Sequence, residues 1–346
     1  MSAVRAFGPG RVNLIGEHTD YNDGLCLPFA IAAGVTVEAT DGPDGAIAAR
    51  AADMGEDDAF ALDPDVEPGD GWRAFVRGTA AELLRAGHAL RGATLTIRGD
   101  VPRGSGLSSS AALEVALALA LLAHDGLAEP ADRRDLARLC SRVENDWVGA
   151  QTGLLDQLAA LFGEEGHAVR LDMRTLTIEP VPLRLDGWRL VTVDSGVEHT
   201  HAGSGYNDRR HECRAAAEQL GVTSLRDATA DTAARLPAPL DRRVRHVLAE
   251  NTRVDEAVAA LGGGDLERLG ALLDASHASL RDDYEVSVPE VDRLVERLRG
   301  DGAAGARMVG GGFGGAVLAL YPPGAEPPPD ALAVAPGPPA RLLEAK

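Results

Sequence analysis

One run near the amino terminus constrains this chain more than any other feature. From residue 10 to 24 it reads Gly-Arg-Val-Asn-Leu-Ile-Gly-Glu-His-Thr-Asp-Tyr-Asn-Asp-Gly. An apolar stretch changes abruptly to polar residues, which predicts a strand that ends in a tight polar loop, a common place for function. The loop carries mostly acceptors and one imidazole, a set that suits sugar hydroxyls better than an anion; its polar residues are Glu17, His18, Asp20, Asn22 and Asp23.

Metal binding is the alternative function for such acidic stretches. As an EF-hand, the 17–24 loop fails in register, because the required glycine would fall at Leu25 and the closing glutamate at Ile31. His199 and His201 flank one threonine without a third ligand nearby, so we interpret them as loop residues.

Size and charge narrow the class of protein. A chain of 346 residues favours two joined domains over one. Its net charge of -19 argues against nucleic acid and anionic membranes as partners. A single nucleotide is still compatible, because backbone amides and a metal ion can create a local anion site.

The distribution of lysine excludes several kinds of chemistry. The only lysine is Lys346. A Walker A loop, a protein kinase and a pyridoxal enzyme each need an internal lysine. Any phosphoryl transfer must therefore depend on metal, arginine and backbone amides.

Cysteines and apolar runs indicate a cytoplasmic protein. Three cysteines without a Cys-x-x-Cys pair predict neither a disulfide framework nor a thiolate zinc site. The first residues have no signal-peptide core, and the longest apolar run, 111–123, contains Glu114 and is too short to span a bilayer.

Periodicity predicts mixed α and β structure. The patterns favour strands at 30–39, 46–51, 93–98, 188–194 and 316–321, and helices at 72–86, 111–123, 131–148, 154–162, 206–219, 241–261, 265–280 and 288–299. We expect the 46–51 strand to pair back on the 30–39 strand, and 331–335 of the proline-rich tail to form an edge strand. The change in character between 163 and 189 predicts a domain junction, which we place at 180/181.

A second motif, Pro102-Arg-Gly-Ser-Gly-Leu-Ser-Ser-Ser110, precedes the apolar helix. Its glycines allow close backbone approach, the helix start offers free N–H groups, and the serines offer hydroxyls. Phosphate binding and a simple serine cap after a loop are both compatible with this pattern. Beside the first motif, we favour phosphate binding.

Two further features are ambiguous when taken alone. Glycines 310–315 form either a turn or a backbone wall of a pocket. Asp156 begins a helix, where it is either an ordinary first-turn acid or a base that faces a substrate hydroxyl.

The three motifs, in this order, resemble the GHMP kinases, and the first motif resembles the galactokinases within that superfamily. Segments 8–34, 71–78, 101–122, 139–163 and 192–227 are all similar to that family. The chain departs from the pattern at Gly8, where alanine usually precedes the proline, at Leu155, where methionine is usual, and in the third motif. None of these changes removes a charged or hydroxyl group from the chemistry.

The resemblance implies a role for each matched residue. It implies Asp156 as base with Arg11 beside it, and a sugar pocket made by Glu17, His18, Asp20, Gly153 and Tyr206. It implies an ATP site that comprises Trp72, Gly104, Ser105, Gly106, Leu107, Ser108, Ser109, Ser110, Gly311 and Gly312. Ser110 and Glu144 fall at the positions of the magnesium ligands.

The implied fold is α+β with two domains, 1–180 and 181–346. The first would be a ribosomal protein S5 domain 2-like lobe and the second a ferredoxin-like lobe, with the active site in the cleft between them. The implied reaction transfers the γ-phosphate of ATP, with Mg²⁺, to the anomeric hydroxyl of α-D-galactose, which is the entry to galactose catabolism. A monomer is expected. A kinase for another sugar, such as N-acetylgalactosamine or arabinose, and a non-catalytic sugar sensor are the alternatives.

Overall fold

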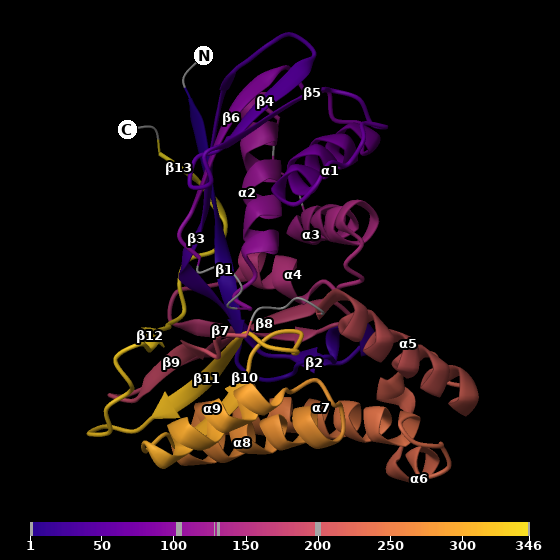
Figure 1. The fold of residues 1–346 in the computed structure, drawn as a ribbon, viewed down its shortest axis with the longest axis vertical. Coiled ribbons are helices and arrows are strands. Elements are labelled where there is room, and N and C mark those ends of the chain that lie inside the picture. The colour runs from indigo at the N-terminus through magenta and orange to yellow at the C-terminus, as the bar shows by residue number, and fades with distance from the viewer. Residues whose placement is uncertain (1–2, 102–105, 128, 130–131, 198–201, 345–346) are drawn as a thin grey trace.

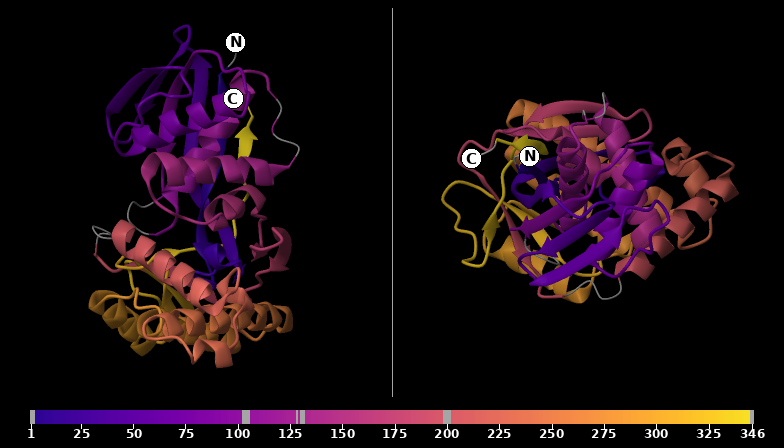
Figure 2. Two further views of the ribbon diagram at one scale, coloured as in Figure 1. Left: turned by 90° about the vertical axis from the view of Figure 1, so that its right-hand side faces the viewer. Right: turned by 90° about the horizontal axis from the view of Figure 1, so that it is seen from above.

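The computed structural model has two lobes of mixed α and β structure, stacked along the long axis of the molecule (Figures 1 and 2). It describes residues 3–101, 106–127, 129, 132–197 and 202–344. Within these residues, no helix combines the length and apolar character needed to cross a bilayer.

The first lobe contains a six-stranded sheet with the order β13-β1-β3-β6-β4-β5. Its strands are β1 (Val4–Asn13), β3 (Pro28–Asp41), β4 (Ala46–Ala51), β5 (Glu56–Ala61), β6 (Ala93–Gly99) and β13 (Arg341–Leu343). The expected pairing of 46–51 on 30–39 is wrong, because β6 occupies that edge of β3 over seven residue pairs. β4 instead pairs with β6 in parallel and with β5 in a hairpin.

Helices cover one face of this sheet. They are α1 (Trp72–Arg85), α2 (Ser109–His124), α3 (Arg133–Arg142) and α4 (Leu155–Phe162). The expected helix at 131–148 is divided, because α3 passes into a π-helix at Val143–Val148.

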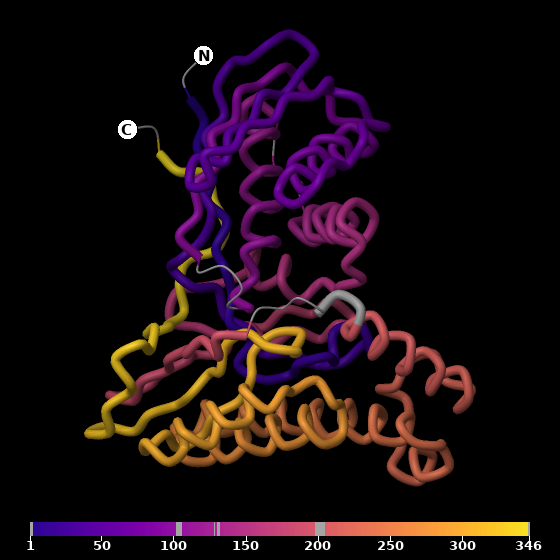
Figure 3. The backbone as a smooth tube through the Cα atoms, in the orientation of Figure 1, coloured from indigo at the N-terminus to yellow at the C-terminus, as the bar shows by residue number. Residues whose placement is uncertain are grey.

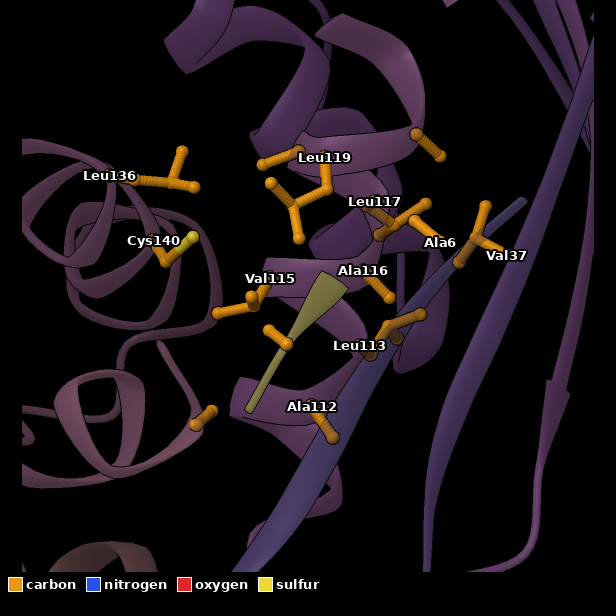
Figure 4. Packing of buried hydrophobic residues seen from close by; sticks show 14 of the residues in the cluster. Ala6, Val37, Ala112, Leu113, Val115, Ala116, Leu117, Leu119, Leu136 and Cys140 are labelled. Carbon is orange, nitrogen blue, oxygen red and sulfur yellow. The ribbon is translucent and has the colours of Figure 1, made fainter. Parts of the chain in front are cut away.

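The central helix α2 is buried on nearly all sides, as its apolar sequence predicts. Figure 4 shows its side chains between Leu136 and Cys140 of α3 and Ala6 and Val37 of the sheet. This packing fixes the start of α2, and with it the serine motif, against strand β1.

The second lobe combines a four-stranded sheet with a layer of helices. The sheet has the order β10-β11-β9-β12, formed by β10 (Gly305–Met308), β11 (Ala316–Tyr321), β9 (Arg189–Asp194) and β12 (Leu332–Ala333). The helices are α5 (Ala202–Leu220), α6 (Ala230–Ala233), α7 (Leu240–Gly263), α8 (Leu266–Asp282) and α9 (Pro289–Gly300). Between the lobes lies a three-stranded sheet of β2 (Leu25–Cys26), β7 (His167–Asp172) and β8 (Thr177–Pro182).

The carboxyl-terminal segment connects both lobes. Strand β12 pairs with β9 at the edge of the second sheet, as the edge-strand expectation for 331–335 anticipates. The chain then returns to the first lobe, where β13 pairs with β1 and brings the two termini near each other (Figure 3). The last residues of the sequence, those of β13, therefore belong to the first lobe in space although they follow the second lobe in the sequence. The domain division at 180/181 stays a prediction.

Candidate active site

A cavity of about 280 Å³ lies where the two lobes meet. It is formed by the end of β1 and the loop that follows it, the segment before α4 with the first residues of that helix, the start of α5, and the glycine patch between β10 and β11. The lining residues are Arg11, Glu17, His18, Asp20, Ala150, Thr152, Gly153, Leu155, Asp156, Tyr206, Asn207, Gly310, Gly311 and Gly312. The expected sugar residues and the expected base therefore lie in one cavity.

The polar loop after β1 is held by its own hydrogen bonds. Thr19 Oγ1 lies 2.9 and 2.7 Å from the carbonyl oxygens of Gly16 and Leu25. The Asn22 amide donates to the His18 carbonyl at 2.9 Å. Gly16 and His18 both have positive φ, 99° and 62°. Such a backbone is rare for a non-glycine residue, so the loop holds His18 in a strained conformation, as is common at functional sites.

Arg11 and Ser108 fix the carboxylate of Asp156. Arg11 Nε and Nη2 donate to its two oxygens at 2.6 and 2.7 Å. Ser108 Oγ donates to the second oxygen at 2.5 Å. The third arginine nitrogen, Nη1, donates to the Gly106 carbonyl at 2.5 Å, so Arg11 also positions the glycine–serine loop. A bidentate arginine pair holds a carboxylate in a defined orientation.

Glu17 is held by the second lobe. Its Oε1 accepts a hydrogen bond from the Gly310 backbone at 2.8 Å and lies 3.0 Å from Nη2 of the fully buried Arg307. Arg307 Nη1 donates to the carbonyls of Asn13 and Leu14 at 2.9 and 3.0 Å. The sugar loop and the glycine patch are thus bound together through one carboxylate and one cation.

Asp20 lies opposite Gly153 in the cavity. A Cβ atom at position 153 would stand 2.0 Å from Asp20 Oδ2, so this carboxylate requires a glycine there. Burial, together with the charges of Asp156 and Glu17, raises the pKa of Asp20 to about 7. Near neutral pH, Asp20 therefore changes between a neutral carboxyl and a carboxylate.

Aromatic rings form one wall of the cavity. The rings of His18 and Tyr206 lie 5.3 Å apart, centre to centre. Burial lowers the pKa of His18 well below its ordinary value, so its imidazole is neutral. His18 Nε2 has no hydrogen-bond partner among the residues that the structure describes.

A second cavity, of about 460 Å³, lies in the first lobe beside the start of α2. Trp72, Ser109 and Ser110 line it among mostly apolar neighbours. The expected adenine-stacking residue and two expected ATP residues thus share one pocket. Gly311 and Gly312 line the first cavity instead. Two of the expected ATP residues, Gly104 and Ser105, lie outside the described residues, and Gly106 and Leu107 follow directly after that segment. His199 and His201, which we interpret as loop residues, also lie outside the described residues.

The pair expected to hold magnesium is preformed. Glu144 is buried and interacts with the Ser110 side chain, and its Oε2 accepts hydrogen bonds from Thr152 at 2.8 Å and Gln157 at 2.9 Å. The described residues contain no cluster of three or more His, Cys, Asp or Glu residues placed to hold a metal. A hydroxyl and one carboxylate nevertheless fit Mg²⁺, which usually binds through one or two protein ligands and takes its other oxygens from phosphates and water.

Sequence reasoning missed several residues at the site. Thr152 and Asn207 line the first cavity, and Arg307 holds Glu17 from behind. The only feature of the sequence that could have indicated Asn207 as a cavity residue is its position directly after Tyr206. Arg307 carried no signal, because a cation inside a buried strand has no recognisable pattern.

Comparisons with known proteins agree with this geometry. Family models for the GHMP kinase N-terminal domain, the galactokinase galactose-binding signature and the GHMP kinase C-terminal domain match residues 74–164, 2–40 and 256–335. The galactokinase of Mycobacterium tuberculosis (strain ATCC 25618 / H37Rv) is 47% identical over 322 residues, which cover 91% of this chain and 88% of that protein. The chain belongs to the galactokinase family. The galactokinase of Roseiflexus sp. (strain RS-1) is 45% identical over 327 residues, 92% of this chain and 82% of its own.

Solved structures agree with membership of the galactokinase family. The crystal structure of Lactococcus lactis galactokinase complexed with galactose aligns with a TM-score of 0.91 at 34% identity, over 99% of this chain and 95% of that one. The expected α+β two-lobe fold and the expected enzyme class, a kinase that uses ATP, are therefore confirmed.

Proposed function

We propose that this galactokinase family member transfers the γ-phosphate of ATP to the anomeric hydroxyl of α-D-galactose, giving galactose 1-phosphate and ADP. The observation that carries the proposal is the pair of hydrogen bonds by which Arg11 holds Asp156 in the first cavity, where Ser108 of the serine motif also donates to it. A fixed carboxylate beside a hydroxyl-binding cavity is the arrangement that phosphoryl transfer to an alcohol requires.

Sugar binding in the first cavity is supported by its polar groups. Glu17 and Asp20 present carboxylate oxygens, and His18 presents an imidazole nitrogen without a protein partner. Gly153 and Tyr206 complete the walls. Several hydroxyls of one small sugar are recognised by such a set, because each can donate to a carboxylate or bond to the ring nitrogen.

ATP binding is supported by the second cavity and the glycine–serine segment. Trp72 offers an aromatic face for adenine, and Ser109 and Ser110 at the start of α2 line the same cavity. Gly104 to Ser110, Gly311 and Gly312 are proposed as the backbone and hydroxyl contacts of the phosphates. We assign Ser110 and Glu144 as the residues that would hold Mg²⁺, which neutralises phosphate charge when bound.

In the proposed mechanism the protein positions groups more than it performs covalent chemistry. Asp156 accepts the hydroxyl proton or orients it, since Ser108 and Arg11 leave its carboxylate only a small range of orientations. Arg11 offsets the negative charge that develops as the phosphoryl group moves. His18 and Glu17 fix the sugar ring so that its reacting hydroxyl meets Asp156.

The product identifies the reaction. Purified protein, ATP, Mg²⁺ and ¹³C-galactose should give a sugar phosphate whose ¹³C and ³¹P signals are coupled at the anomeric carbon. Phosphate at another carbon would refute the assigned position. The same product formed only from N-acetylgalactosamine or arabinose would support the alternative kinase. Galactose binding with no product would support the sensor.

The remaining expectations also stay proposals. These are a monomer that works in the cytoplasm, where ATP is available, and a division of the chain into domains 1–180 and 181–346.

A further inference from the structure

A series of hydrogen bonds, partly buried at the sugar loop and buried at its far end, runs from that loop into the second lobe. His18 Nδ1 lies 2.8 Å from the Tyr21 hydroxyl, which lies 2.8 Å from the Tyr284 hydroxyl. The Tyr284 oxygen lies 3.0 Å from Cys213 Sγ. The Asn22 amide donates to the same sulfur at 3.6 Å. The proposed mechanism uses only the His18 end of this chain.

Proton counting allows two arrangements of the chain. Each of its three contacts holds one proton, and the two tyrosines supply two of them. The third comes either from Nδ1–H of a neutral His18, with all protons pointing toward Cys213, or from the Cys213 thiol, with all protons pointing toward His18. In the first arrangement His18 Nε2 is an acceptor, and in the second it carries the N–H.

Three observations favour the second arrangement. An imidazole nitrogen is a stronger acceptor than a phenol oxygen or a sulfur, so the Tyr21 hydroxyl donates best to Nδ1. The Asn22 amide already donates to Cys213 Sγ, which leaves the thiol proton for Tyr284. His18 lines the cavity beside the acidic side chains of Glu17, Asp20 and Asp156, and its Nε2 has no partner among the described residues, so a donor at Nε2 complements these acceptors.

We propose that Tyr21 is a positioning residue that sets the tautomer of His18, so that Nε2–H points into the cavity and donates to a substrate hydroxyl. Tyr284 and Cys213 hold the Tyr21 hydroxyl from the second lobe. The identity of that substrate rests on the proposed function, whereas the tautomer does not.

The test is nitrogen NMR of the full chain labelled with ¹⁵N-histidine, without substrate, combined with calorimetric titration of galactose. A His18→Gln sample identifies the His18 signals. Tyr21→Phe removes the hydroxyl and keeps the ring. Tyr321→Phe is the matched control, because its hydroxyl is also buried but bonds to the Leu298 carbonyl at 3.4 Å, away from the cavity.

In the unsubstituted protein we expect His18 signals of a neutral ring with the proton on Nε2. Tyr21→Phe should shift them toward a mixture of tautomers and weaken galactose binding by about threefold to tenfold, the range for one hydrogen bond, without changing ATP affinity. Tyr321→Phe should change neither. A proton on Nδ1 in the unsubstituted protein, or unchanged signals in Tyr21→Phe, overturns the inference. The expected tautomer without any galactose binding would refute the proposed substrate and leave the inference standing.

Discussion

Arg11 and Asp156 are 145 residues apart in the sequence, and the arginine donates to both carboxylate oxygens, at 2.6 and 2.7 Å. Strand β1 supplies the arginine and the start of α4 supplies the acid, so the core of the first lobe sets their geometry. Because Arg11 also donates to the Gly106 carbonyl, one side chain links the expected base to the expected phosphate loop.

Asp156→Asn should abolish turnover while galactose still binds. The amide keeps the shape but cannot accept a proton, and general bases contribute roughly 100- to 10,000-fold to rate. Steady-state kinetics and galactose calorimetry measure the two effects. Asp146→Asn, an exposed acid on the neighbouring π-helix, is the control and should behave normally. Near-normal activity in Asp156→Asn would remove this residue from the mechanism.

Glu17→Ala should weaken galactose binding much more than ATP binding, and should also destabilise the protein. Its removal leaves the buried Arg307 cation without its ion-pair partner, a loss that typically costs about 3–5 kcal/mol. Glu17→Gln separates the loss of the ion pair from the loss of the hydrogen bond, because the amide oxygen can still accept from the Gly310 backbone. Urea unfolding and titration of each ligand check this. Equal losses for both ligands would assign Glu17 a purely structural role.

Asp20 should make stability depend on pH in a defined direction. Its pKa is raised from 3.8 to about 7, so the folded state binds more protons than the unfolded state between these values. The stability that Asp20 contributes is therefore full below about pH 4 and lost as pH rises through 7. Relative to Asp20→Asn, the native protein should lose on the order of 4 kcal/mol of unfolding free energy between pH 4 and 8. A constant difference across this range, measured by urea unfolding, would contradict the raised pKa.

Gly153→Ala should weaken galactose binding strongly. The added methyl group would stand 2.0 Å from Asp20 Oδ2, so the Asp20 carboxylate would have to move. Gly262→Ala carries the same substitution on helix α7 into open space and should leave binding unchanged. Calorimetry with galactose compares the two variants. Equal affinities would show that the Asp20 position does not matter for the sugar.

Trp72→Ala should weaken ATP binding and leave galactose binding unchanged. Loss of one stacking aromatic typically costs about 1–3 kcal/mol, which is roughly fivefold to 150-fold in affinity. Trp72→Phe keeps an aromatic face in the same cavity and should lose less. Fluorescent nucleotide titration of both variants tests this. Tight ATP binding by Trp72→Ala would place adenine elsewhere.

Local patterns predicted much of the fold and most of the cavity. Helix α2 was predictable because a helix that is apolar on all sides must be buried. The polar loop was predictable because the change from apolar to polar residues after β1 is abrupt. Its side chains, Glu17, His18 and Asp20, all line the cavity.

What could not be predicted depends on contacts between distant segments. The periodicity of 131–148 indicates one helix and does not reveal the π-turn that carries Glu144. The return of β13 to β1 is invisible, because a proline-rich segment has no alternation. Arg307 behind Glu17, and Tyr284 behind Tyr21, are side chains of the second lobe whose partners only the folded chain defines.

The central claim is tested most directly by ADP release from purified protein with ATP, Mg²⁺ and a panel of sugars, with and without a chelator. The account predicts rapid ADP release that strongly prefers galactose over N-acetylgalactosamine and arabinose and stops when the chelator removes Mg²⁺. ADP release that prefers another sugar of the panel would contradict the proposed substrate. No ADP release with any sugar, while galactose still raises the melting temperature, would contradict catalysis itself.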